Sequence, residues 1–148
     1  MNAMPEIAEL VPHAGRMVLL QRVLDWDAER IRCMTASHRQ PDNPLRRDGR
    51  LAAVNGAEYG AQAAAIHGAL NGRAGDGYLV AARDLTWTRA RLDDIETELL
   101  VSAERVMVQP RAVIYRFRID PQAEADGANS PPVVSGQVTI FLGGETAR

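Results

Sequence analysis

The sequence predicts an α+β fold in which an antiparallel β-sheet surrounds one long, buried helix. Residues 56–70 are small or apolar on nearly every side of a predicted helix, and such a helix is normally covered by other structure. Short runs with the alternation of β-strands precede and follow it. Because 148 residues can bury a real core, we expect one domain over residues 1–148.

Before this helix the chain has the pattern of a β-hairpin. We expect a short helical turn at residues 5–11, then strands at residues 17–26 and 29–38. The two residues between these strands form a connection short enough for a hairpin. Residues 39–51 contain two Pro, one Gly and several polar side chains, which predicts a loop.

Four strand-like runs follow the helix, which we expect to end near Gly72. They cover residues 78–90, 97–108, 111–120 and 133–142. A polar, Pro-rich stretch separates the last two runs and predicts a hairpin loop.

Alternation within two of these runs predicts which side chains share a face of the sheet. In the third run, apolar residues alternate with charged ones, and the apolar face consists of Val113, Tyr115, Phe117 and Ile119. In the second run, one face consists of Val101, Ala103, Arg105 and Met107. The opposite face of that run consists of Ser102, Glu104, Val106 and Val108.

Composition excludes several classes of function. The net charge of −2 gives no basic excess of the kind that binds nucleic acid, and no apolar run could span a membrane. The first residues lack the basic start and apolar stretch of a signal peptide, so we expect a cytoplasmic protein. Cys33 is the sole cysteine and the His residues are widely separated, so we expect no disulfide, metal or cofactor. All 17 basic residues are Arg, which excludes a Schiff-base lysine.

Two motifs carry a family resemblance. Residues 10–23 read Leu-Val-Pro-His-Ala-Gly-Arg-Met-Val-Leu-Leu-Gln-Arg-Val and resemble the opening of the 3-hydroxyacyl-[acyl carrier protein] dehydratases. Residues 56–63 resemble the helix of the same family, with Glu58 and Gln62 in register. The Ala-Gly-Arg-Met variant and residues 38–46 look closer to one branch, the dehydratase-like proteins of aryl polyene and xanthomonadin pigment clusters.

This resemblance implies the hot-dog fold, in which the sheet wraps around the helix. It also implies removal of water from 3-hydroxyacyl thioesters held on the pantetheine arm of acyl carrier protein, in aryl polyene or fatty-acid-type synthesis. Family members form dimers whose active sites take residues from both subunits, so we expect a homodimer or a heterodimer with a related hot-dog subunit. The two sheets would join through the strand after the helix, residues 77–85.

Dehydration requires an acid for the C3 hydroxyl and a base for the C2 proton. Glu58 matches the family's acid, although acids also favour the first turn of any helix. Gly56 would let the thioester oxygen approach the helix N-terminus, and Gln62 would support the substrate site. Arginines that could meet the acidic carrier protein or the phosphate of its arm are Arg16, Arg83, Arg89 and Arg91.

Three histidines compete for the role of base. Family members carry it in a Gly-His-Phe-Pro segment, but here residues 43–45 occupy that place and read Asn-Pro-Leu. His38 begins the loop that leads to the helix, the region where the family places its base, and His13 lies in the first shared motif. We therefore favour His38 slightly over His13 as the base. His67 is nine residues beyond Glu58, on the other side of the helix, and is expected to be a packed side chain.

Two rival functions stay open at this point. A thioesterase of the same fold would use the carboxylate to activate water. A non-catalytic subunit that stabilises a catalytic paralogue would explain the missing Gly-His-Phe-Pro histidine.

Overall fold

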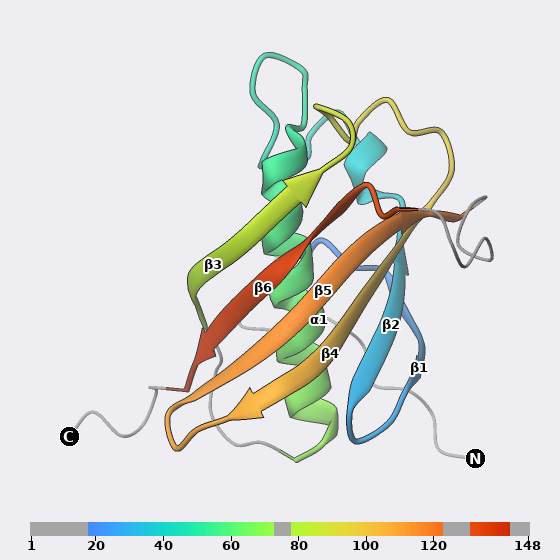
Figure 1. Cartoon of the computed structure of the whole chain (residues 1–148). Coiled ribbons are helices and arrows are strands. Elements are labelled where there is room, and N and C mark those ends of the chain that lie inside the picture. Colours follow the sequence, from blue (N-terminus) through green and yellow to red (C-terminus); the bar gives the residue numbers. More distant parts are fainter. Residues whose placement is uncertain (1–17, 73–77, 123–130, 143–148) are drawn as a thin grey trace.

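A computed structural model describes residues 18–72, 78–122 and 131–142. The predicted helical turn at residues 5–11 and two candidate site residues, His13 and Arg16, lie outside this part of the chain. In the described part, one α-helix lies against a six-stranded antiparallel sheet (Figure 1). The predicted fold class is confirmed.

The elements follow the predicted order. They are β1 (Arg22–Trp26), β2 (Arg30–Thr35), the 3₁₀ turns η3 (Ser37–Arg39) and η4 (Ala53–Asn55), α1 (Gly56–Leu70), β3 (Tyr78–Trp87), β4 (Leu99–Val108), β5 (Ala112–Pro121) and β6 (Val134–Phe141). The strands lie in the order β1-β2-β4-β5-β6-β3, so β1 and β3 are the two edges. No helix in the described ranges is long and apolar enough to cross a membrane.

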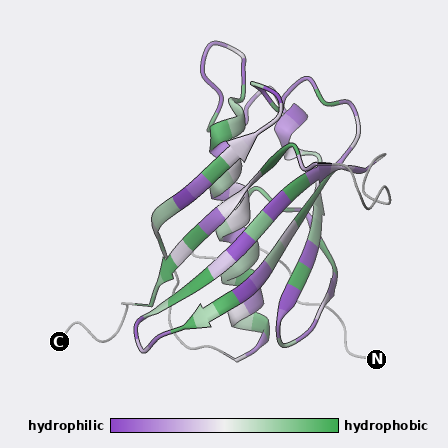
Figure 2. Ribbon diagram, in the orientation of Figure 1, coloured by the Kyte–Doolittle hydropathy of each residue, from purple (hydrophilic) through white to green (hydrophobic). Residues whose placement is uncertain are grey.

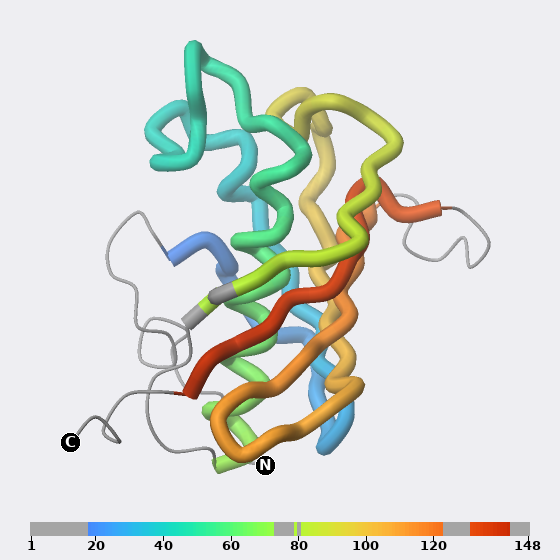
Figure 3. The backbone as a smooth tube through the Cα atoms, turned by 60° about the vertical axis from the view of Figure 1, so that its left-hand side comes forward, coloured from blue at the N-terminus to red at the C-terminus, as the bar shows by residue number. Residues whose placement is uncertain are grey.

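The helix begins at Gly56 as predicted and ends at Leu70, slightly before the predicted end near Gly72, and its small residues permit close packing on the sheet. Most of α1 is buried, and Figure 3 shows it running along one face of the sheet. A Cβ atom on Gly60 would lie 2.5 Å from the ring of Phe117 on β5. A Cβ atom on Gly56 would lie 3.0 Å from the side chain of Ile119 on the same strand. These contacts bring the helix backbone close to the middle of the sheet.

The first strand is shorter than predicted. We expected it to start at residue 17, but β1 starts at Arg22. Leu19 is held in another way: its N–H donates to Oε1 of Gln62 at 2.9 Å, and its carbonyl accepts from the hydroxyl of Thr35 at 2.6 Å. The backbone before β1 is therefore bound partly by side chains rather than by a continuous ladder.

The alternation predicted for β5 is confirmed, since its four inward residues are at most 3% exposed. The prediction for β4 is wrong at its end. A register shift between Arg105 and Met107 moves Met107 out of the buried face, and its side chain is 49% exposed. A β-bulge adds a residue to one strand, so the period of two breaks there.

The edge strand β3 is irregular. Its pairing with β6 shifts register between Leu79 and Ala81 and again between Arg83 and Thr86. Asp84, inside the second shift, has a φ of 55°, in the left-handed region that non-Gly residues seldom adopt.

Candidate active site

The N-terminal end of α1 is held by backbone hydrogen bonds to the chain that follows β3. The N–H of Ala53 donates to the carbonyl of Ala90 at 2.9 Å, and the N–H of Leu92 donates to the carbonyl of Leu51 at 2.8 Å. Oδ1 of Asp93 accepts from the N–H of Leu51, also at 2.8 Å. The start of the helix is thus fixed relative to the end of the edge strand β3.

Glu58 lies in the first turn of this helix and is half-buried. It follows Gly56 by two residues, which turns it roughly 200° around the helix. Because Gly56 packs on the sheet, the carboxylate of Glu58 points away from β5 and β6. No hydrogen bond or ion pair from the described residues reaches this carboxylate. The side chain of Glu58 is therefore directed away from its own sheet.

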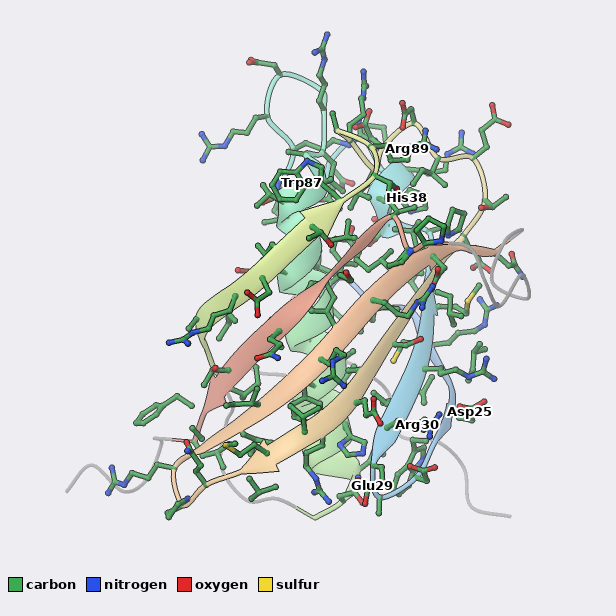
Figure 4. All side chains as sticks on the ribbon, viewed as in Figure 1. Asp25, Glu29, Arg30, His38, Trp87 and Arg89 are labelled. Carbon is green, nitrogen blue, oxygen red and sulfur yellow. The ribbon has the colours of Figure 1, made fainter. Side chains whose placement is uncertain are left out.

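Apolar side chains are exposed at the same end of the molecule. Val54 in η4 is 45% exposed, and Trp87 at the end of β3 is 48% exposed. The two elements that carry them pack against each other, and Figure 4 shows Trp87 in front of the first turns of α1. The open edge of β3 and this apolar surface are thus continuous.

His38 lies in η3 and is 0% exposed. Its Nε2 donates to the carbonyl of Ile95 at 2.9 Å. A neutral imidazole has one N–H, so Nδ1 carries no proton, and no described atom bonds to it. Burial lowers the pKa of His38 below its ordinary value; the carbonyls of Ile95 and Thr97 oppose this, and the nearby charges of Arg39 and Arg46 add to it. The side chain is a buried neutral base with one unused nitrogen.

A buried network joins η3 to the first turn of α1. The amide Nδ2 of Asn43 donates to the carbonyl of Ser37 at 2.9 Å and to the hydroxyl of Tyr59 at 3.0 Å. The Tyr59 hydroxyl lies 2.9 Å from Oγ of Ser37 and can donate its own proton there. Burial raises the pKa of Tyr59. Ser37, next to His38 in the chain, and Tyr59, next to Glu58, are therefore joined by hydrogen bonds.

Sequence reasoning missed this network. The available signal was Tyr59, a large side chain with a polar hydroxyl in a helix of mostly small residues, directly after Glu58. Its partners Ser37 and Asn43 come from a loop, where no periodicity marks burial.

The other predicted residues have packing or pairing roles in the structure. Gln62 holds Leu19, and Gly56 makes room for the sheet. Arg89 pairs with Asp94 at 3.1 Å, and Arg91 pairs with Asp93. Arg83 is exposed on the edge strand β3. Binding of substrate or carrier protein by these residues stays a prediction.

His67 is at the opposite end of α1 from Glu58, packed as expected. Its ring meets Tyr115 edge-on, and Nδ1 lies 2.7 Å from the Tyr115 hydroxyl. Nε2 lies 2.8 Å from the carbonyl of Asp27 and must donate to it, so Nδ1 accepts from the tyrosine. His67 thus lies at the far end of the helix from Glu58, whereas His38 lies in η3, whose Ser37 contacts Tyr59 in the first turn of α1. Among the described residues, no three His, Cys, Asp or Glu side chains converge to hold a metal ion.

Solved structures with a similar fold include a dehydratase heterocomplex and a thioesterase superfamily member. The dehydratase heterocomplex ApeI:P from Xenorhabdus doucetiae superimposes with a TM-score of 0.77 at 18% identity, covering 97% of this chain and 95% of that chain. Thioesterase superfamily member 2 from zebra fish gives 0.64 at 16% identity, covering 93% of each chain. The E. coli PaaI protein from the phenylacetic acid degradation operon gives 0.60 at 11% identity, covering 81% of each chain. At these identities the likeness shows the hot-dog fold.

The family follows from the sequence itself. No curated protein matches the chain. The family model of the ApeP-like proteins, described as ApeP dehydratase, matches residues 5–146. The chain therefore belongs to the ApeP-like dehydratase family.

Proposed function

We propose that this chain takes part in dehydration of 3-hydroxyacyl thioesters on acyl carrier protein, in an active site shared with a related hot-dog subunit. The observation that carries the proposal is Glu58. Its carboxylate is in the first turn of α1, turned away from its own sheet, and no described residue pairs with it. Aryl polyene or fatty-acid-type chain synthesis is the setting that the family membership favours.

In the proposed reaction a base removes a proton from C2 of the acyl chain. The thioester oxygen gains negative charge, which backbone N–H groups at the start of α1 can stabilise. The carboxyl group of Glu58 gives its proton to the C3 hydroxyl, which leaves as water. A carboxyl enclosed away from water favours its protonated form, so the site must be closed over the substrate for this step.

The base has to come from a side chain that substrate can reach. His38 has an unprotonated nitrogen, but it is fully buried and its Nε2 is held by Ile95. While η3 keeps this position, His38 does not touch a bound acyl chain. We therefore favour His13, with a histidine of the second subunit as the alternative, and assign His38 to holding the loop beside Glu58.

The second subunit is expected at the edge strand β3. An edge strand presents unpaired backbone groups that a second strand can complete. Here the edge is flanked by the exposed side chains of Trp87 and Val54. The similar ApeI:P structure is described as a heterocomplex. This favours a related subunit, rather than a second copy of this chain, as the partner.

The test is mass spectrometry of a 3-hydroxyacyl carrier protein incubated with the chain and its co-expressed partner. We expect loss of one water from the acyl group. Glu58→Gln should slow this at least about 100-fold, because a positioned acid is removed while the size of the side chain is kept. The matched control is Glu96→Gln, an exposed acid on the loop before β4.

Other outcomes separate the rivals. Release of the free hydroxy acid would identify a thioesterase, in which Glu58 activates water. Loss of water at an unchanged rate in Glu58→Gln would instead identify this chain as a non-catalytic partner.

A further inference from the structure

The outer face of the sheet, on the side away from α1, carries a groove of about 640 Å³. The sheet lies in front of the helix in Figure 2, and hydrophilic residues recur there on neighbouring strands. Small residues form part of the lining, including Ser102, Ser135 and Gly136. Long side chains from the flanking strands form the walls. This groove is distinct from the candidate active site at the N-terminal end of α1.

Strand register places the arginines in two rows across the sheet. The first row runs from Arg30 on β2 through Glu104 on β4 to Arg116 on β5. The second row runs from Arg32 through Ser102 to Arg118 on the same three strands. Four guanidinium groups therefore surround the centre of β4. Figure 4 shows Arg30 at the end of β2.

The groove is basic although the whole chain carries a net charge of −2. Four arginines and two carboxylates, Asp84 and Glu104, line it. Arg32 is paired with Asp25, and Arg118 binds Asp120 through two nitrogens at 2.8 and 2.9 Å. These carboxylates orient two of the guanidinium groups on either side of the groove.

The first row is the less neutralised of the two. Arg116 lies 3.6 Å from Glu104, beyond hydrogen-bond distance, and both side chains are at least half exposed. Arg30 forms no ion pair with any carboxylate in the described part of the chain. Arg30 and Arg116 therefore keep donors available to an anionic ligand.

The spacing of the arginines matches an α-helix. Strands lie about 4.8 Å apart, so the arginines of β2 and β5 stand about 10 Å apart, close to the width of one helix. Alternate residues along a strand lie about 6.7 Å apart, and residues four apart along a helix lie about 6 Å apart. A helix laid along the strands could thus present successive acidic side chains to Arg30 and Arg32, or to Arg116 and Arg118.

We propose that this groove docks an acidic helix of a partner protein, with Arg30 and Arg116 as its main charged contacts. Carboxylates spaced four residues apart on that helix pair with the arginines that follow each other along a strand, Arg30 and Arg32 on β2 or Arg116 and Arg118 on β5. Glu104, at the centre, opposes such a ligand and limits its affinity.

The probe is a synthetic helical peptide of about 20 residues with Glu at every fourth position and Ala or Gln elsewhere. Fluorescence anisotropy of the labelled peptide is measured against the full chain at low and physiological salt. We expect binding that weakens with salt, because exposed charges are screened. The same peptide with Gln in place of Glu should not bind.

Charge reversal identifies the surface. Arg30→Glu with Arg116→Glu should weaken binding about tenfold or more. The matched control, Arg47→Glu with Arg50→Glu, makes the same charge change on the exposed loop between η3 and η4 and should change binding less than about twofold. Glu104→Gln should strengthen binding, a gain that cannot arise from misfolding. If the charge-reversed double variant has a lowered melting temperature, Arg30→Gln with Arg116→Gln replaces it in the binding measurement.

Three results would overturn the proposal: no binding of the acidic peptide, equal weakening by both double variants, or weaker binding by Glu104→Gln. Tighter, Arg30-dependent binding of a single-stranded oligonucleotide than of the peptide would replace an acidic helix with a phosphate backbone as the occupant.

Discussion

Two histidines are 0% exposed, His67 near the C-terminal end of α1 and His38 in η3, near the N-terminal end of α1, but their hydrogen bonding differs. At the C-terminal end, both ring nitrogens of His67 have partners, the Tyr115 hydroxyl and the Asp27 carbonyl. At the N-terminal end, His38 has one partner and a buried Nδ1 without any described one. Polar groups buried for stability alone are normally satisfied. The difference singles out His38 as the buried histidine whose hydrogen-bonding capacity is not fully used.

Matched substitutions test this comparison, and the largest effect is expected at the satisfied end. His67→Leu should lower the free energy of unfolding by about 3 kcal/mol, because it leaves the Tyr115 hydroxyl buried without its partner and removes a contact to the β1–β2 turn. Urea denaturation measures this. Tyr115→Phe should cost less, about 1 kcal/mol. A loss under about 1 kcal/mol for His67→Leu would contradict the assignment.

The same substitution at the other end should cost less. His38→Leu removes one hydrogen bond and also removes the unsatisfied Nδ1, so we expect a loss of about 1 kcal/mol in urea denaturation. Equal losses for His38→Leu and His67→Leu would show that Nδ1 is satisfied in solution. If dehydration falls far more than stability does, the loop around η3 is needed for the reaction.

The sequence foresaw α1 and β5 because their patterns are local. An Ala-rich run predicts a helix, and four alternating apolar residues predict one face of a strand. It did not foresee the bulge between Arg105 and Met107, because alternation assumes a constant period. The burial of His38 depends on Ile95, a residue 57 positions away, and no local pattern reports such a contact.

The candidate site was predicted only in part for the same reason. Glu58 was predicted from a resemblance in the helix. The structure adds that its side chain, in the first turn of α1, points away from the sheet. The network of Ser37, Asn43 and Tyr59 brings a loop to a helix. Such side chains look like ordinary loop polarity until the fold places them together.

The pH dependence of stability offers a smaller test of the N-terminal end. Burial lowers the pKa of His38 below 6.5, so the unfolded chain binds a proton at a higher pH than the folded chain does. This contribution to stability is complete above about pH 6.5 and is lost as pH falls through the folded pKa. Between pH 7.5 and 5, the urea midpoint should fall less in His38→Leu than in the parent chain. Identical slopes would contradict a neutral buried His38.

The smallest effect is expected at the β1–β2 turn, where the carbonyl of Asp27 accepts a hydrogen bond from His67. Oδ1 of Asp27 accepts from the N–H groups of Glu29 and Arg30 at 2.8 and 2.9 Å. Asp27→Ala removes these exposed bonds but keeps the carbonyl that His67 contacts, so we expect a loss of about 0.5–1 kcal/mol. A melting curve measures it. A loss as large as that of His67→Leu would mean that the turn, rather than the histidine, holds this end.

The irregular backbone of β3 has a consequence for aggregation of the chain. A straight exposed edge can template the stacking of many copies into one endless sheet. Two register shifts, with Asp84 in a left-handed conformation between residues of the second, break β3 into short segments of different twist. Only a strand whose backbone matches these irregularities can form a continuous hydrogen-bonded ladder with β3. The irregular edge thereby protects the chain from open-ended polymerisation through β3.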